Sequence, residues 1–276
     1  MRAAKQPAMP ETLTMNDGRT IPAIGFGTYL VPQDDAARIT REGVDVGYKL
    51  VDTAAFYANE SGVAEGLGGR DDIFVTTKLW RSDMGYDSAL RAFDRSLAQL
   101  GRDSVDLYLI HWPMPSLGKH VETWKALVRL REEGRARSIG VSNFGPDHLA
   151  AIIDATGVAP ALNQVELHPG FQQRALREFH AGHGILTQSW APLGQGTTLE
   201  HPEIVRIAAA RGCAPAQAIL AWHLHHGLAV IPKASARERL AANLAASEVM
   251  LTAEDIAAID ALDDPAGRLG PDPAKL

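Results

Sequence analysis

The 276-residue sequence contains a single cysteine, Cys213, which excludes a disulfide bond within the chain. Chains without disulfides are typical of a reducing compartment. No part of the sequence approaches the ~18 consecutive apolar residues of a membrane-spanning helix. Residues 1–10 carry two cations and two prolines but no apolar core like that of a signal peptide. We therefore expect a cytoplasmic protein with a disordered lead over residues 1–10.

The sequence also has no excess of positive charge. It contains 27 Lys and Arg residues and 33 Asp and Glu residues, which gives a net charge of −6. The overall charge attracts neither nucleic acid nor an anionic membrane, and we expect no partner of either kind. An anionic ligand would need a local basic cluster. With 46% hydrophobic and 22% charged residues, the composition is that of a globular protein with a large core.

Short apolar runs alternate along the chain with longer amphipathic ones, a pattern typical of strands and helices in turn. The expected strands are 21–27, 49–54, 73–79, 105–112, 136–143, 161–167, 185–191 and 228–233. The expected helices are 34–46, 59–67, 87–100, 121–133, 146–155, 172–180, 201–210 and 235–246, with a further helix at 252–262. Ser235 with Glu238, and Thr252 with Asp255, have the spacing of a capping box at a helix start.

Eight strand–helix units in this length predict an α/β fold of the (β/α)8 TIM-barrel type, whose usual size is ~250 residues. Residues 13–15 and 20–21 flank the turn Asn16-Asp17-Gly18-Arg19, which predicts an N-terminal β-hairpin across the barrel floor. A doubly wound sheet is the rival fold, but no Gly-x-Gly-x-x-Gly follows the first strand. We expect one domain over residues 11–276, with an extra C-terminal helix and loop.

Four polar residues lie at or near the expected strand ends, where barrel enzymes carry their chemistry. Asp52, Lys78 and His111 are near the ends of the second, third and fourth strands, and Tyr57 lies in the loop after Asp52. Singly, each has a structural explanation: a buried ion pair, a packed phenol or a hydrogen-bonded imidazole. Because neighbouring strands are ~4.8 Å apart, the four side chains can meet in one pocket, and together they favour catalysis.

The combination suits proton donation to a carbonyl oxygen. A free tyrosine titrates near ~10, and a cationic Lys78 close to the hydroxyl would lower the pKa of Tyr57. Asp52 would supply the countercharge for Lys78, and His111 would orient the carbonyl group. The four residues offer no source of hydride, so a nicotinamide cofactor is expected.

Segment 47–57, Gly-Tyr-Lys-Leu-Val-Asp-Thr-Ala-Ala-Phe-Tyr, resembles the aldo-keto reductase motif, and the resemblance extends from about residue 13 to 273. It implies a bacterial, diketogluconate-reductase-like carbonyl reductase that uses NADPH. It also implies that Asp52, Tyr57, Lys78 and His111 form the catalytic tetrad, with Tyr57 as general acid.

A row of side chains along the later strands is expected to bind the cofactor. The amides and hydroxyl of Ser142, Asn143 and Gln164 suit a carboxamide, and Trp190 offers a face for the nicotinamide ring. Asn143 alone could simply end its strand or cap a helix. Many relatives carry tyrosine or phenylalanine in place of Trp190. The complete expected set is Gly27, Thr28, Ser142, Asn143, Gln164, Trp190, Leu193, Gly194, Lys233, Ser235, Arg239 and Asn243.

The family resemblance assigns the adenosine 2′-phosphate to Lys233 and Arg239, beside a helix start after the last strand. Two positions depart from the family pattern, since Ala234 replaces a serine and Ala242 a glutamate. One phosphate contact and one adenine contact are therefore missing, which narrows the preference for NADPH over NADH.

Tyr29, Phe56, Trp80 and Trp112 each lie beside an expected catalytic or cofactor residue and would line an aromatic substrate pocket, although core packing is the plainer explanation for any one of them. The tail 267–273 resembles the family loop that shapes substrate choice. Aldehydes, ketones, dicarbonyls and keto-sugars are the expected small-molecule substrates.

The sequence 223–226, His-Leu-His-His, has no carboxylate at ligand spacing, and we expect no metal site. Two other functions stay open. A Schiff-base aldolase could use Lys78, but a lysine paired with Asp52 stays charged. A sensor or interaction module could bind NADPH with little turnover. We expect a monomer.

Overall fold

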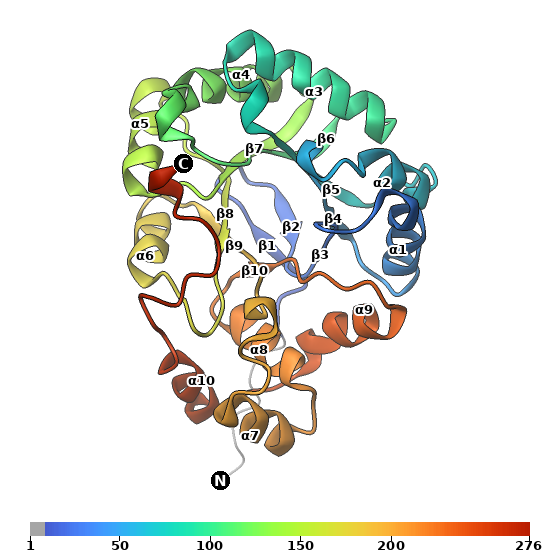
Figure 1. Cartoon of the computed structure of the whole chain (residues 1–276), viewed down its shortest axis with the longest axis vertical. Coiled ribbons are helices and arrows are strands. Elements are labelled where there is room, and N and C mark those ends of the chain that lie inside the picture. Colours follow the sequence, from blue (N-terminus) through green and yellow to red (C-terminus); the bar gives the residue numbers. More distant parts are fainter. Residues whose placement is uncertain (1–8) are drawn as a thin grey trace.

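The computed structural model describes residues 9–276. The predicted disordered lead at 1–10 falls mostly outside these residues and stays a prediction. Eight parallel strands form one sheet in the order β3 to β10. Gly25 N donates to Val230 O at 2.8 Å and Val230 N to Ala23 O at 2.9 Å, which joins the last strand to the chain entering the first. The strands thus close the predicted (β/α)8 barrel, and Figure 1 shows the helices surrounding it.

The elements follow the predicted alternation. The barrel strands are β3 (Phe26–Gly27), β4 (Leu50–Asp52), β5 (Phe74–Leu79), β6 (Val105–Ile110), β7 (Ala136–Ser142), β8 (Leu162–Glu166), β9 (Leu186–Trp190) and β10 (Ala229–Val230). The helices are α1 (Gln33–Asp45), α2 (Glu60–Leu67), α3 (Tyr86–Leu100), α4 (His120–Glu132), α5 (Pro146–Thr156), α6 (Arg174–Gly182), α7 (Pro202–Arg211), α8 (Pro215–His225), α9 (Arg237–Leu244) and α10 (Ala253–Asp260).

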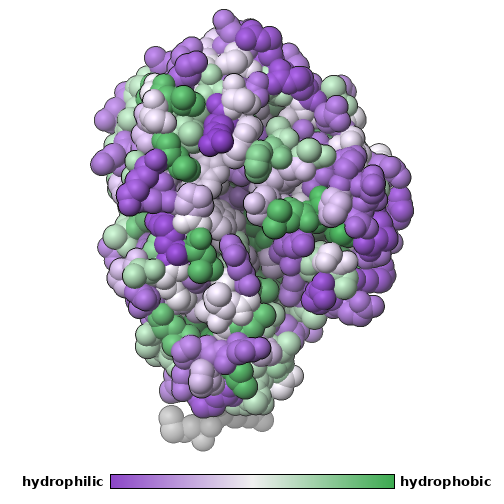
Figure 2. Space-filling view, in the orientation of Figure 1, coloured by the Kyte–Doolittle hydropathy of each residue, from purple (hydrophilic) through white to green (hydrophobic). Residues whose placement is uncertain are grey.

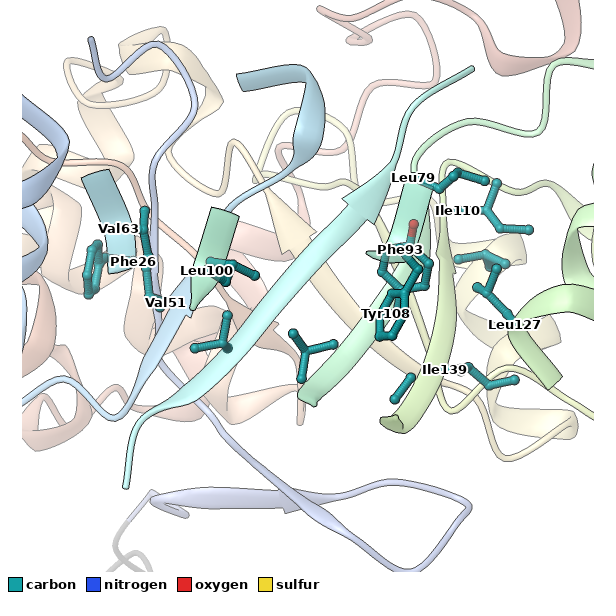
Figure 3. Packing of buried hydrophobic residues seen from close by; sticks show 14 of the residues in the cluster. Phe26, Val51, Val63, Leu79, Phe93, Leu100, Tyr108, Ile110, Leu127 and Ile139 are labelled. Carbon is teal, nitrogen blue, oxygen red and sulfur yellow. The ribbon is translucent and has the colours of Figure 1, made fainter. Parts of the chain in front are cut away.

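Apolar side chains hold the helices against the outer face of the strands. Phe93 of α3 meets Tyr108 of β6 edge to face, with ring centroids 4.6 Å apart, and Ile110 and Leu127 are buried in the same core. Figure 3 shows this layer of side chains between the strands and the surrounding helices. Strands covered on both faces need apolar residues on both, which explains the nearly continuous apolar runs in the sequence.

The predicted hairpin covers the barrel floor. β1 (Thr12–Thr14) pairs antiparallel with β2 (Thr20–Pro22). Asn16 Nδ2 donates to Pro160 O at 2.8 Å, just before β8, and Ser138 Oγ in β7 donates to Asp17 Oδ2 at 2.6 Å. Met15 and Ile21 are buried with leucines of β4, β6 and β8. The floor is therefore closed, and the opposite end carries the free strand ends.

Three local predictions were wrong. The first expected strand, 21–27, is divided between β2 and β3, because Ile21 pairs with Leu13 in the hairpin. Helix α8 was missed because it is apolar and buried along most of its length, so no amphipathic period marks it. The capping box at Ser235 is absent, since α9 begins two residues later at Arg237.

The second capping box was predicted correctly. Asp255 N donates to Thr252 Oγ1 at 3.3 Å, and Thr252 N donates to Asp255 Oδ2 at 3.0 Å, at the start of α10. Among residues 9–276 no single helix is both long and apolar enough to cross a membrane. Helices α7 and α8 reach that length and composition only as a pair bent by 89°.

Burial of histidine makes stability depend on pH. Asn163 Nδ2 lies 2.9 Å from His180 Nε2, and Thr187 Oγ1 lies 2.8 Å from His180 Nδ1. Burial lowers the pKa of His180 from 6.5 to about 4. Between these values the unfolded chain binds the proton and the folded chain does not, so this contribution to stability is lost as the pH falls from 6.5 to about 4.

We predict that His180→Gln lowers the free energy of unfolding at pH 7 but reduces its fall between pH 7 and pH 4.5. Urea unfolding of both proteins at the two pH values measures this. The exposed His225→Gln should behave like wild type at both. An equal fall in wild type and His180→Gln would contradict the assignment.

Candidate active site

The structure brings the four expected catalytic residues together at the carboxyl ends of the strands. Lys78 of β5 contacts Asp52 Oδ1 at the end of β4, and its Nζ donates to Thr53 O at 3.0 Å. Lys78 Nζ also lies 3.2 Å from the Tyr57 hydroxyl, which a short 3₁₀ turn after β4 presents. His111 follows β6, and its ring centroid is 5.5 Å from that of Tyr57.

Asp52 and Lys78 form an ion pair with side chains 2% and 0% exposed. Burial raises the pKa of Asp52 and lowers the pKa of Lys78, and the contact between them opposes both shifts. Gln164 Nε2 donates to the second carboxylate oxygen at 2.7 Å. Each charge therefore depends on the other, because neither has solvent to stabilise it.

The predicted direction of the Tyr57 pKa was wrong. Burial, with the neighbouring Asp52 and Tyr29, raises the pKa of Tyr57 well above its ordinary value. Lys78 lies within hydrogen-bond reach, but its charge is already engaged by Asp52. Tyr57 is therefore a protonated phenol at neutral pH, able to give up its proton only when a strong acceptor arrives beside it.

His111 is a neutral imidazole. Burial, and then the charge of Lys78, lower the pKa of His111 well below 6.5. Among the described residues, no partner accepts or donates a hydrogen bond at its buried Nδ1. A neutral imidazole still carries one N–H, which suits a hydrogen bond to a substrate oxygen without adding a charge.

The expected nicotinamide-binding residues form a connected row along β7, β8 and β9. Trp190 Nε1 donates to Asn143 Oδ1 at 2.8 Å, and Asn143 Nδ2 donates to His111 O at 3.0 Å. Ser142 Oγ donates to Gln164 O at 2.8 Å. Since Gln164 also contacts Asp52, this row and the ion pair form one polar network.

The expected phosphate residues lie in the loop after β10 and at the start of α9. Lys233 and Arg239 are exposed, and Arg239 Nη2 donates to Ser235 Oγ at 3.2 Å. Asn243 is 5% exposed on the inner side of α9. Ala234 is packed into the core, between the exposed Lys233 and the start of α9, which carries the exposed Arg237 and Arg239.

Leu193 and Gly194 lie in the loop after β9, where Gly194 has a φ of +56°. Gly27 ends β3 and Thr28 follows it. Gly27 N donates to Pro232 O at 3.3 Å and Thr28 Oγ1 to Asp52 O at 3.1 Å, so these two residues join neighbouring strand ends.

Aromatic side chains border the open end of the barrel. The rings of Phe56 and Trp80 are stacked with their centroids 3.8 Å apart, and the ring centroids of Tyr29 and Tyr57 are 5.2 Å apart. Trp112 is half-buried and packs against the core. Tyr29 and Phe56 are 50% and 47% exposed. Figure 2 shows a hollow near the centre of this face, with residues of mixed hydropathy around it.

Asn59 is a buried residue beside the site whose contacts the sequence did not reveal. Its Nδ2 donates to Thr28 O at 2.9 Å and Val31 O at 3.0 Å, and its Oδ1 accepts from Thr53 Oγ1 at 2.9 Å. These bonds join the loop after β3 to the loop that carries Tyr57. The only signal was its place two residues after Tyr57, just beyond the motif.

Two features lie outside the site. A groove of about 420 Å³ beside α6, whose lining includes Arg177 and Leu228, contains none of the four residues. In the described part of the chain, no three His, Cys, Asp or Glu side chains gather as a metal site. In the sequence 223–226, His-Leu-His-His, both ring nitrogens of His223 lie near backbone oxygens, those of Ile219 and Leu167.

Comparison with known proteins identifies the family. The model of the aldo/keto reductase family matches residues 23–264. An aldo-keto reductase of Mycolicibacterium smegmatis is 47% identical over 269 residues, which cover 96% of this chain and 98% of that protein. A solved structure of a Gox0644 mutant in complex with NADPH is 51% identical, covers 98% of this chain and 99% of its own, and has a TM-score of 0.95.

An aldo-keto reductase of Bombyx mori, solved in complex with NADP, is more distant. It is 30% identical, with 93% of this chain and 94% of that chain covered and a TM-score of 0.86. The chain belongs to the aldo/keto reductase family, a family of oxidoreductases.

We predict that Lys78→Met lowers the free energy of unfolding by about 3–5 kcal/mol, because it leaves Asp52 buried without a countercharge. The double variant Asp52→Asn/Lys78→Met should be more stable than Lys78→Met alone, since both charges are then absent. Urea unfolding of the two variants and wild type measures the difference. A double variant less stable than Lys78→Met would show that the charge imbalance is not the cause.

Proposed function

We propose that the protein reduces an aldehyde or ketone to the alcohol with NADPH, with Tyr57 as general acid. The observation that carries this proposal is the Tyr57 hydroxyl, 3.2 Å from Lys78 and beside the buried Asp52–Lys78 pair at the open end of the barrel. A protonated phenol with a fixed cation beside it can donate a proton and then stabilise the phenolate that remains.

The described residues fit a nicotinamide group. No described residue donates to Gln164 Oε1, and the buried Nδ1 of His111 also has no partner, so the row retains hydrogen-bonding capacity. In the proposed complex Ser142, Asn143 and Gln164 hold the carboxamide, and Trp190, fixed by its bond to Asn143, lies against the ring. When bound, the reduced nicotinamide supplies the hydride.

The protein's own residues act on the oxygen of the substrate carbonyl group. His111, neutral and close to Tyr57, orients the oxygen through a hydrogen bond. As the oxygen gains negative charge it becomes the strong acceptor that Tyr57 requires, and the phenol proton moves to it. Lys78 then stabilises the phenolate, with Asp52 keeping Lys78 charged.

The preference for NADPH rests on the loop after β10. Lys233 and Arg239 are exposed cations beside the start of α9, and they suit an adenosine 2′-phosphate. The NADPH complex of Gox0644 supports this choice by similarity. Ala234 and Ala242 lack the side chains that make one phosphate contact and one adenine contact in the family. NADH is therefore the cofactor with which NADPH should be compared.

The aromatic border supports substrates whose carbonyl carries an apolar or planar group, with dicarbonyls and keto-sugars as further classes. We also propose that residues 11–276 act as one domain, because the hairpin and the barrel share a buried cluster. A monomer in a reducing cytoplasm is compatible with the single, unpaired Cys213.

We predict that Tyr57→Phe abolishes carbonyl reduction while NADPH binding stays nearly unchanged, because only the acidic proton is removed. Loss of absorbance at 340 nm with aldehydes, dicarbonyls and keto-sugars measures turnover, and fluorescence titration measures binding. The neighbouring Tyr29→Phe is the matched control and should retain turnover. Normal turnover by Tyr57→Phe would exclude the mechanism. Tight NADPH binding by wild type without turnover would instead indicate a sensor.

We predict that Arg239→Ala raises the KM for NADPH about tenfold, the cost of losing one charge-assisted hydrogen bond to phosphate, and leaves the KM for NADH within about twofold. Arg237→Ala, the exposed neighbour on the same helix, is the control and should change neither. Equal increases for both cofactors would argue against a 2′-phosphate contact.

A further inference from the structure

A buried carboxylate at the rim of the barrel has no part in the proposed chemistry. Glu166 ends β8 and is 1% exposed. Its register partner is Trp190 at the end of β9, and Gln164 lies two residues earlier on the same face of β8. Glu166 therefore stands one layer above the amide row, where a buried negative charge needs compensation.

The C-terminal segment, residues 264–276, supplies that compensation. Leu269 N donates to Glu166 Oε1 at 2.5 Å, and Gly270 N donates to Glu166 Oε2 at 2.8 Å. His168 Nε2 lies 3.3 Å from Oε1. Burial alone would raise the pKa of Glu166, but these hydrogen bonds outweigh it and the pKa is lowered. Both oxygens of the carboxylate are thus used to hold consecutive backbone amides.

The same contact involves Trp190, which we propose lies against the nicotinamide ring. A Cβ atom at Gly270 would lie 2.7 Å from Trp190 Cη2 and 2.9 Å from Glu166 Oε2, closer than van der Waals contact allows. The backbone of the C-terminal segment therefore rests directly on the Trp190 indole. Only glycine leaves room for Glu166 to bind the amide and for Trp190 to keep its place.

Other anchors place the C-terminal segment across the rim. Arg268 lies over the Phe171 ring at 4.7 Å, in the loop after β8. At the far end, Ser116 N donates to Leu276 O at 3.3 Å, in the loop after β6, the strand that His111 follows. Figure 1 shows the segment, in red, passing from α10 beside β8 to the C terminus near α5.

We propose that Glu166 is a positioning residue that fastens the C-terminal segment over the substrate side of the barrel mouth, with Gly270 seated on Trp190. This inference rests on the proposed function for its effect on catalysis. Because the carboxylate binds two successive amides, it fixes the direction of the backbone as well as its position. The C-terminal segment, which borders the proposed substrate site, therefore rests on Trp190, the residue that we propose lies against the nicotinamide ring.

The first test is hydrogen exchange of the full-length protein with NADPH present, followed by mass spectrometry. In Glu166→Gln one amide loses its acceptor and faces the new NH2 group, so we expect exchange in residues 266–276 to accelerate about tenfold. Exchange in β4 to β7 should stay as in wild type. Glu178→Gln, an exposed glutamate on α6, is the control and should change neither.

The second readout is a split of kinetic constants with benzaldehyde as the probe substrate. A displaced C-terminal segment weakens substrate binding, so Glu166→Gln should raise KM about fivefold, with kcat within twofold and NADPH affinity within threefold. A residue that only stabilises the fold would not produce this split.

Gly270→Ala tests the same contact without touching the carboxylate, and it answers the question if Glu166→Gln does not fold. Its Cβ should push the C-terminal segment off Trp190 and reproduce both the faster exchange and the higher KM. Unchanged exchange in the folded variants, or an unchanged KM with faster exchange, would overturn the proposal. If wild type binds NADPH but reduces no carbonyl, the proposed function fails, and exchange alone decides whether Glu166 fastens the segment.

Discussion

The buried ion pair between Asp52 and Lys78 is the interaction on which the rest of the site depends. Two charges with almost no solvent exposure persist only because they lie against each other and because Gln164 and Thr53 O satisfy their remaining hydrogen bonds. The pair fixes Lys78 next to Tyr57, and through Gln164 it fixes the row of amides. A single electrostatic constraint therefore places both the proposed acid, Tyr57, and the proposed cofactor site.

The closed barrel brings together the residues that form this polar network. Asp52 and Gln164 are 112 residues apart in the chain, yet they meet because β4 and β8 belong to the same closed sheet. The hairpin seals the other end, which leaves the carboxyl ends of the strands as the open face. On that face Asn59 joins the first loops and Glu166 holds the last segment, each by hydrogen bonds to backbone atoms.

Much of this arrangement could be read from the chain. The alternation of apolar and amphipathic runs predicts the barrel, and the motif around Asp52 and Tyr57 predicts which strand ends carry chemistry. The errors have physical causes. Helix α8 is buried on most sides and therefore lacks an amphipathic period. Lys78 was expected to lower the pKa of Tyr57, but burial and Asp52 reverse the direction.

The sequence by itself predicted the alternation of strands and helices, the acidic, basic, phenolic and imidazole side chains that lie near strand ends, and the cations after the last strand, because these depend on residue type and short-range spacing. Only the tertiary structure decided how strongly each group is buried, which oxygen of Asp52 meets Gln164, and that Glu166 binds amides 103 and 104 residues further along. Burial and long-range hydrogen bonds are properties of packed elements, and no local pattern of residues encodes them.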